Sequence, residues 1–421
     1  MKTIAVYADW EGMPAPTCVG QLSATPARGR EVFSFAYDPG WLGGGLGQSL
    51  DPALLLYAGP QYPPAPKENF GLFLDSSPDR WGRFLMQRRE AQAARREGRK
   101  ARQLLESDYL LGVHDSHRMG ALRFRTAPDG AFLDDTAAYA APPWTSLREL
   151  EEASRQIEKP GAEKSTDYEK WIRMLIAPGG SLGGARPKAG VRDVAGHPWI
   201  AKFPSRNDTS DIGTWEFLVH GLAIKAGIAV SEAQVKKFSS EYGTFLTRRF
   251  DRTDTGERTH FASAMTLLNR ADGDDHTAGV SYLELADFLQ QSGAQPEADL
   301  KQLWRRIVFF MCVSNVDDHL RNHGFLLEPG SGWRLSPAYD MNPVPFAEGL
   351  KLNVSESDNS QDLQLALEVA TFFRLKPREA KETVAEVVAA VKTWRTAANA
   401  LGISHREQEG MEPAFRVADT E

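Results

Sequence analysis

A short polar stretch in the last third of the chain places the strongest constraint on the fold. Asp317 precedes Asn322 by five positions, and Asp340 follows a predicted hairpin over residues 324–327 and 333–335. This order of carboxylate, carboxamide and carboxylate is typical of phosphoryl-transfer enzymes, in which one group accepts a proton and two hold Mg²⁺. The pattern predicts a kinase with Asp317 as the catalytic base and with Asn322 and Asp340 as the magnesium ligands.

The same residue types have simpler explanations. Asp and Asn favour helix ends and turns, because their side chains hydrogen-bond nearby backbone amides. His319 and His323 have the spacing of a zinc pair, but no glutamate adjoins His319 and no third ligand is recognisable. We expect His319 to brace the loop or to contact a phosphate of ATP.

A glycine-rich loop lies upstream, over residues 179–188. Glycines let backbone amides approach phosphate oxygens closely, so the loop suits a nucleotide. It matches neither a Walker A loop nor the G-x-G-x-x-G of protein kinases, and a glycine-rich hairpin explains it equally well on its own. The residues predicted here to bind ATP are Gly183, Gly184, Ala185 and Lys188.

An ordered set of further features follows this loop. Lys202 lies in an apolar strand and is predicted to contact ATP phosphate, and Glu216 opens the next helix, where the partner of such a lysine belongs. Each residue is also common at a strand edge or on a solvated helix. Arg248 and Phe250 lie at the end of a later predicted strand, where we expect the ATP-binding hinge.

Composition limits the class of protein. A chain of 421 residues with 42% hydrophobic residues is too long to be built around a single hydrophobic core, so two or three domains are expected. The net charge of -7 argues against a polyanion-binding surface over the whole protein. Cys18 and Cys312 cannot form a disulfide framework, and no signal peptide or membrane span is recognisable, which predicts a cytoplasmic protein.

The order of patterns predicts three parts. Residues 1–140 form a β-rich subdomain with a basic helix that includes Arg88 and Arg102, residues 141–253 form a kinase N-lobe, and residues 254–421 form a helical C-lobe. A helix start is expected around residues 75–81, and strand-like alternation over residues 109–125. The basic helix face is either solvated or directed at an acidic partner or DNA phosphates.

Six motifs together resemble the HipA-type serine/threonine kinases, toxins of bacterial toxin–antitoxin pairs. They are Arg118–Phe124, Gly180–Lys188, Ile200–Pro204, Arg249–Arg252, Asn315–Asn322 and Leu335–Asp340. The chain departs from eukaryotic-type protein kinases, because no His-Arg pair precedes Asp317 and Met341 follows Asp340 where Phe is usual.

The resemblance implies an α+β, two-lobed protein-kinase-like fold with an extra β-rich N-terminal subdomain and an all-helical C-lobe. It also implies ATP and Mg²⁺ as cofactors and autophosphorylation of Ser181. A phosphate there would add negative charge beside the triphosphate and repel ATP. Without the resemblance, Ser181 is equally a turn residue.

The same resemblance implies partners. They are a protein substrate, in studied family members an aminoacyl-tRNA synthetase, and a small helix-turn-helix antitoxin that binds operator DNA. The stretch from Arg88 to Arg102 is a candidate for direct DNA contact. Two alternatives remain open at this point: a small-molecule kinase, and a non-catalytic corepressor within a DNA-bound complex.

Overall fold

The computed structural model describes residues 1–44, 48–127, 129–133, 141–176 and 184–420. Ser181 and Gly183 therefore lie outside the described residues. The chain forms two compact units, the first comprising Met1–Asn207 and Lys237–Ala262 and the second Asp208–Lys236 and Ser263–Glu421. The three-part division at residues 140 and 253 remains a prediction.

The first unit opens with an antiparallel sheet of strand order β3-β2-β1-β4. Its strands are β1 (Lys2–Ala8), β2 (Thr17–Ala27), β3 (Arg30–Tyr37) and β4 (Leu122–Arg125). Arg28 and Gly29 both have positive φ and connect β2 to β3, as a two-residue hairpin turn requires. These strands lie within the range predicted as a β-rich N-terminal subdomain, and that subdomain over residues 1–140 remains a prediction.

Six α-helices are found in the first unit among its described residues, 1–44, 48–127, 129–133, 141–176, 184–207 and 237–262. They are α1 (Pro39–Gly43), α2 (Gly71–Asp75), α3 (Arg80–Arg96), α4 (Glu106–Leu111), α5 (Leu147–Ile157) and α6 (Tyr168–Ile176). The predicted helix start near residue 80 is confirmed, and its cap is Asp79, which accepts a hydrogen bond from the amide of Gly82. The expectation of strand over residues 109–125 is confirmed only at its end, in β4, and is wrong at its start, because the Asp108 carboxylate accepts from the Leu105 amide and nucleates α4.

A second sheet in this unit contains β5 (Lys188–Arg192), β6 (Pro198–Lys202) and β8 (Thr244–Arg248), and β9 (Phe261–Ser263) follows in the chain. β6 pairs antiparallel with both β5 and β8. One face of this sheet packs on α3, α5 and α6 through a shared core that includes Leu150, Ile172, Ala189, Ala201 and Leu246. Apolar burial over this area positions the end of the glycine-rich loop at β5.

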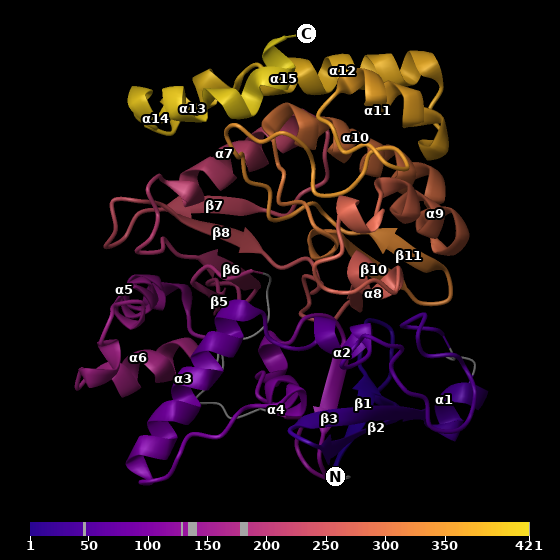
Figure 1. The fold of residues 1–421 in the computed structure, drawn as a ribbon, viewed down its shortest axis with the longest axis vertical. Helices are drawn as coiled ribbons and strands as arrows, with labels where there is room; N and C mark the ends of the chain where they lie inside the picture. The colour runs from indigo at the N-terminus through magenta and orange to yellow at the C-terminus, as the bar shows by residue number, and fades with distance from the viewer. Residues whose placement is uncertain (45–47, 128, 134–140, 177–183, 421) are drawn as a thin grey trace. The chain divides into compact units, whose positions relative to one another are not determined.

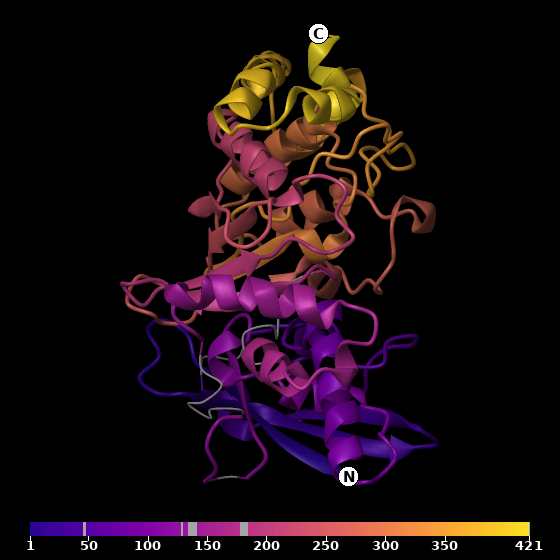
Figure 2. The ribbon, with the colours of Figure 1, turned by 90° about the vertical axis from the view of Figure 1, so that its left-hand side faces the viewer.

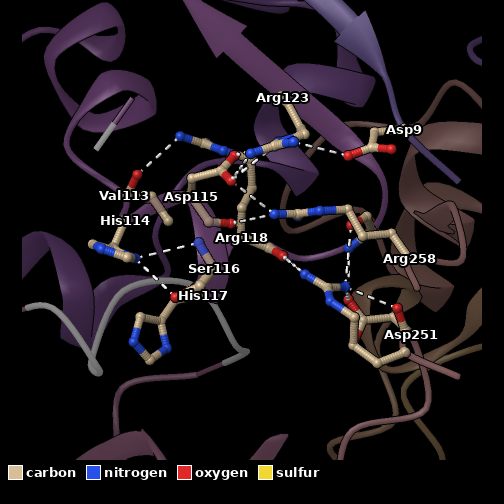
Figure 3. A network of polar contacts seen from close by, with 12 residues as sticks. Asp9, Val113, His114, Asp115, Ser116, His117, Arg118, Arg123, Asp251 and Arg258 are labelled. Atoms are coloured by element: carbon tan, nitrogen blue, oxygen red, sulfur yellow. Dashed lines mark hydrogen bonds and ion pairs between the residues drawn. The ribbon is translucent and has the colours of Figure 1, made fainter. Parts of the chain in front are cut away.

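A buried arginine network joins the loop after β8 to the segment before β4 (Figure 3). Asp251 is fully buried and accepts hydrogen bonds from Arg249, Arg252 and the amide of Gly120 at 2.6–2.8 Å. Arg249 also donates to the carbonyls of His117 and Arg118 at 3.0 Å. Burial alone would raise the pKa of Asp251, but the charges of Arg249 and Arg252 hold it well below its usual value.

A second carboxylate extends the network toward β1 and β4. Asp115 accepts from Arg123 and Arg258 at 2.7 and 2.9 Å, and Arg123 also pairs with Asp9 (Figure 3). Arg118 is completely buried and donates to main-chain carbonyls, including that of Val113. Burial lowers the pKa of Arg118 to about 9. The network ties segments far apart in sequence within the first unit.

The second unit is mostly helical. Its helices and strands are α7 (Ile212–Lys225), β7 (Ala233–Lys236), α8 (Ala264–Leu267), α9 (Tyr282–Ser292), α10 (Pro296–Val313), β10 (Gly324–Glu328), β11 (Gly332–Leu335), α11 (Leu363–Val369), α12 (Pro377–Val391), α13 (Trp394–Ala400), α14 (His405–Met411) and α15 (Arg416–Asp419). Helix α10 is the centre, with α9, α11, α12 and α15 packed around it (Figures 1 and 2). Its last seven residues, 307–313, are all buried.

Short 3₁₀ helices complete the description. They are η1 (Asp115–His117), η3 (Trp144–Ser146), η4 (Ala162–Lys164), η5 (His276–Ala278), η6 (Leu320–Asn322), η7 (Ala370–Phe373) and η8 (Glu412–Phe415). Among the described residues, no helix combines the length and the apolar character needed to cross a membrane.

The expectation of an all-helical part after residue 254 is wrong. β10 and β11 form an antiparallel hairpin there, with Phe325 opposite Leu335. Gly330 and Gly332 both have positive φ, which lets the chain reverse between the strands. The hairpin predicted at residues 324–327 and 333–335 is confirmed, and it lies between the two acidic segments of the candidate site.

Candidate active site

The candidate site begins where α10 ends. Ser314 adopts a left-handed conformation with φ of 48°, and the amide of Asn315 bonds the carbonyl of Phe310 at 3.0 Å. A left-handed residue of this kind is a common way to end a helix and turn the chain away. The following residues therefore leave the buried helix as a loop held at its base by the core.

Asp317 and Asn322 are brought together by this loop. The Nδ2 group of Asn322 donates to the main-chain carbonyl of Asp317 at 3.0 Å, and the amide of His319 bonds the same carbonyl at 3.0 Å. Asn322 is buried, whereas Asp317 is exposed. No side chain among the described residues pairs with the Asp317 carboxylate. An exposed carboxylate on a fixed backbone suits a proton acceptor for an incoming hydroxyl.

The segment carrying Asp340 is bonded to the same loop. Asn315 Oδ1 accepts from the amide of Asn342 at 3.0 Å, and the amide of Val344 bonds the carbonyl of Ser314 at 3.1 Å. The Tyr339 hydroxyl, one residue before Asp340, donates to the carbonyl of Arg321 at 2.8 Å. The structure thus fixes the backbone on both sides of Asp340 against the loop that carries Asp317 and Asn322.

A buried cluster beneath the loop was not predicted from the sequence. Asp318 Oδ2 accepts from the Tyr282 hydroxyl at 2.7 Å and lies 2.6 Å from His323 Nε2. All three side chains are buried. Burial, followed by the nearby Asp318 charge, raises the pKa of Tyr282 well above its usual value, so its hydroxyl remains a donor. The sequence signal for this cluster is that two acids, Asp317 and Asp318, are adjacent, because neighbouring side chains in an extended segment point in different directions and can have different roles.

In the first unit, Lys188 anchors the end of the glycine-rich loop. Its ammonium group lies 2.8 Å from the Asp79 carboxylate and donates to the carbonyl of Gly184 at 3.0 Å. Both side chains of the pair are almost completely buried, at 3% and 6% exposure. Gly184 has φ of 87°, a conformation that other residues rarely adopt. Ala185 is exposed beside it.

The remaining predicted ATP contacts lie on other elements. Lys202 is directly opposite Lys188 in the β5–β6 pairing, and its ammonium lies 5.7 Å from the centre of the Phe245 ring. Arg248 forms an ion pair with Asp254, and Phe250 contacts Phe261. Glu216 is buried in α7 of the second unit. The pairing of Lys202 with Glu216 stays a prediction.

The oxygen donors of the second unit fit Mg²⁺ shared with a nucleotide. Because Asn322 uses its Nδ2 to bond Asp317, its Oδ1 is the atom suited to a cation, and Asp340 supplies a carboxylate. Among the described residues, no group of three His, Cys, Asp or Glu side chains is arranged to hold a metal ion by itself. Mg²⁺ is usually held by one or two carboxylates together with substrate phosphates and water, which matches this set.

Comparison with known proteins places the chain in a family. Residues 180–395 match the HipA-like C-terminal domain, a span of just over half the chain. The chain belongs to this family, and the resemblance read from its motifs is confirmed.

Two curated proteins named as putative kinases are similar to parts of this chain. A Haemophilus influenzae protein named "Putative kinase" is 30% identical over 132 residues, covering 29% of this chain and 38% of the relative. A Sinorhizobium fredii protein named "Putative kinase Y4dM" is 26% identical over 246 residues, covering 53% of this chain and 56% of the relative. The chain thus spans about half or less of the curated relatives it matches.

The structural match covers nearly the whole chain. The HipA structure in a complex of HipA, HipB and operator DNA from Shewanella oneidensis MR-1 superposes with a TM-score of 0.66 and 17% identity, covering 99% of this chain and 95% of the other. At this identity the match establishes the fold, which is a mixed α/β fold shared with HipA.

Proposed function

We propose that the protein is an ATP- and Mg²⁺-dependent serine/threonine protein kinase of the toxin–antitoxin type. The observation that carries this proposal concerns Asp317. Its carboxylate is exposed, and its main-chain carbonyl accepts a hydrogen bond from the buried side chain of Asn322. Membership of the HipA-like family and two relatives named as kinases support it.

In the proposed reaction, Asp317 accepts the proton of a Ser or Thr hydroxyl as that oxygen bonds to the terminal phosphorus of ATP. The bond between this phosphorus and the bridging oxygen breaks, and ADP leaves with the electron pair. Asp317 is suited to this role because it is exposed to a substrate while its backbone is fixed. Asp318 has no access to a substrate, since it is buried against Tyr282 and His323.

The remaining roles concern ATP and the metal. Asn322 Oδ1 and the Asp340 carboxylate would hold Mg²⁺, which neutralises phosphate charge when bound. Lys202 would contact phosphate and pair with Glu216, and Lys188 would keep the end of the glycine-rich loop in place through Asp79. Arg248, Phe250 and His319 are further proposed ATP contacts.

We extend the proposal to regulation and partners. Ser181 is the proposed site of autophosphorylation, and the proposed partner is a small helix-turn-helix antitoxin bound to operator DNA. The Shewanella structure, which contains HipA, HipB and operator DNA, supports a partner of this kind. The protein substrate is proposed to carry the accepting Ser or Thr hydroxyl, and an aminoacyl-tRNA synthetase is the first candidate.

Incubation with γ-labelled ATP and Mg²⁺ tests the proposal. Label should appear on the wild-type protein, and mass spectrometry should locate it on Ser181. Asp317→Asn should remove it, while ATP binding measured by calorimetry persists. If Asp317→Asn is labelled at the wild-type rate, Asp317 is not the base. If Ser181→Ala is labelled as strongly as wild type, the modification site is elsewhere.

A further inference from the structure

A cavity of about 540 Å³ lies in the first unit, between α3, α6 and α4. It is separate from the elements that carry Asp317, Asn322 and Asp340, which belong to the second unit. Helices α3 and α6 pack side by side (Figure 1), and side chains from both line the cavity. We refer to it as the α3–α6 groove. Its volume lies within the range of sites that bury a ligand the size of a few amino-acid side chains.

The floor of the groove is aliphatic. Met86 and Ala93, seven positions apart, lie on one face of α3, and Ile172 and Ile176 lie on the facing side of α6. Leu104, from the loop before α4, and Leu111, at the end of α4, complete the floor. No aromatic side chain lines this groove among the described residues. A surface of this kind favours aliphatic side chains, whereas single-stranded nucleic acid is usually held by stacking on aromatic rings.

The rim of the groove is basic. Its arginines are Arg89, Arg96, Arg102 and Arg173. Three of them have well-exposed side chains, with fractions of 71% for Arg96, 55% for Arg102 and 65% for Arg173. Exposed arginines on both sides of an apolar floor attract anions to the edges of the site.

The acids of the groove are already paired. Glu90 accepts from Arg99 at 2.6 Å and Asp108 from Arg102 at 2.7 Å, and these two carboxylates are only 11% and 12% exposed. Glu169 is more exposed, at 45%, and is shared by Arg96 and Arg173. Arg89 has no acidic partner among the described residues. The lining holds four arginines and three carboxylates, so its net charge is positive, and the exposed pairs are weak enough for an incoming carboxylate to share.

The spacing of the arginines selects among anionic partners. Arg89 and Arg96 lie seven residues apart on α3, about 10 Å along the helix axis. One phosphate or carboxylate group cannot contact both, so a lipid with a single headgroup would use only part of the rim. A peptide with several carboxylates can contact both arginines while its aliphatic side chains enter the floor.

We propose that the α3–α6 groove binds an acidic peptide segment of a partner protein, with aliphatic side chains seated between Met86 and Ile172. This interaction is independent of the proposed kinase reaction. It also gives the arginines between residues 88 and 102 a binding role other than contact with DNA.

The test uses the full-length protein and a fluorescein-labelled synthetic peptide in which leucines alternate with glutamates. Fluorescence anisotropy should show saturable binding by the wild type. Arg89→Ala should weaken binding about fivefold, the loss expected for one exposed ion pair. Ala93→Phe should abolish binding by filling the floor, with circular dichroism confirming an unchanged fold.

Matched controls separate this proposal from simple charge attraction. Arg95→Ala removes the same charge from the same helix, but Arg95 bonds the Glu163 carbonyl and does not line the groove, so binding should be unchanged. A peptide with serines in place of leucines should bind at least tenfold more weakly. Equal binding of both peptides would overturn the proposal. So would a duplex DNA that binds more tightly than the peptide and loses affinity in Arg89→Ala.

Discussion

The side-chain amide of Asn322 is hydrogen-bonded to the main-chain carbonyl of Asp317 at 3.0 Å. A proposed metal ligand therefore also fixes the backbone of the proposed base. The two roles use different atoms of one carboxamide, because Nδ2 donates to the carbonyl and Oδ1 remains for a cation. Substitutions of Asn322 can separate the two roles.

Asn322→Asp keeps an oxygen for Mg²⁺ but cannot donate to Asp317 when ionised, whereas Asn322→Ala loses both contacts. Both variants should lower kcat by about 10²-fold, because a small displacement of a catalytic group has an effect of this size. Only Asn322→Ala should also raise the Mg²⁺ concentration needed for half-maximal activity. Steady-state phosphorylation at varied Mg²⁺ measures both quantities.

The control for this experiment is Asp287→Asn, an exposed position on α9. It should leave kcat and the Mg²⁺ requirement unchanged. If Asn322→Asp turned over as fast as the wild type, the hydrogen bond to Asp317 would have no role in catalysis.

The buried cluster of Asp318, Tyr282 and His323 should matter for both stability and rate. Tyr282→Phe removes one hydrogen bond to Asp318 and should lower the free energy of unfolding by about 1–3 kcal/mol, because the buried carboxylate loses a donor. Urea denaturation measures the stability, and phosphorylation assays measure kcat. His323→Gln should have a comparable effect, since it weakens the second contact.

A double variant tests whether the two contacts act together. If the loss of unfolding free energy in the double variant equals the sum of the losses in Tyr282→Phe and His323→Gln, the two side chains do not cooperate through Asp318. We expect non-additivity, because both bond the same Oδ2 atom.

Asp251→Ala should be among the most destabilising single changes in the first unit. It would leave the guanidinium groups of Arg249 and Arg252 buried without their carboxylate, which should lower the free energy of unfolding by about 3–5 kcal/mol. Asp254→Ala is the matched control in the same segment, because Asp254 is 86% exposed and pairs with Arg248 at the surface. Asp254→Ala should lower the free energy of unfolding by less than about 1 kcal/mol in the same denaturation assay. Equal losses in the two variants would contradict the importance of burial.

His260 should make stability depend on pH. Burial lowers the pKa of His260 to about 3, so between pH 6.5 and 3 the unfolded chain takes up a proton that the folded chain does not. Stability therefore falls as the pH falls through this window, with a contribution from His260 of about 2 kcal/mol between pH 7 and pH 5. Urea denaturation at a series of pH values measures the slope.

His260→Gln should reduce this slope without removing it, because burial also lowers the pKa of His117 well below its usual value. His405→Gln is the control, since its side chain is 83% exposed. A wild-type slope that persists unchanged in His260→Gln would mean that His260 is not the titrating group.

Sequence reasoning predicted the parts of the candidate site that depend on local order. The spacing of Asp317 and Asn322, the hairpin and the helix starting near residue 80 all follow from rules that act over a few residues. The structure confirms the hairpin and the helix, and it joins Asp317 to Asn322.

The missed features depend on partners far apart in the chain. Asp318 is hydrogen-bonded to Tyr282, 36 positions away in the chain, and Arg249 is hydrogen-bonded to His117, 132 positions away. No local propensity encodes such contacts, because they arise only when buried polar groups must find donors or acceptors in the packed protein. The all-helical C-lobe is what the family resemblance implies, whereas the local sequence itself predicts the β10–β11 hairpin that contradicts it.

The arginine network sets a limit on how this chain can be shortened. The family match begins at residue 180, yet Arg249, Arg252 and Arg258 all donate to groups between residues 115 and 120. A fragment beginning at residue 180 would keep three guanidinium groups while discarding the carbonyls and the carboxylate that receive them. Expression of the family-matched segment alone should therefore yield insoluble protein, and useful truncations should retain residues 115–125.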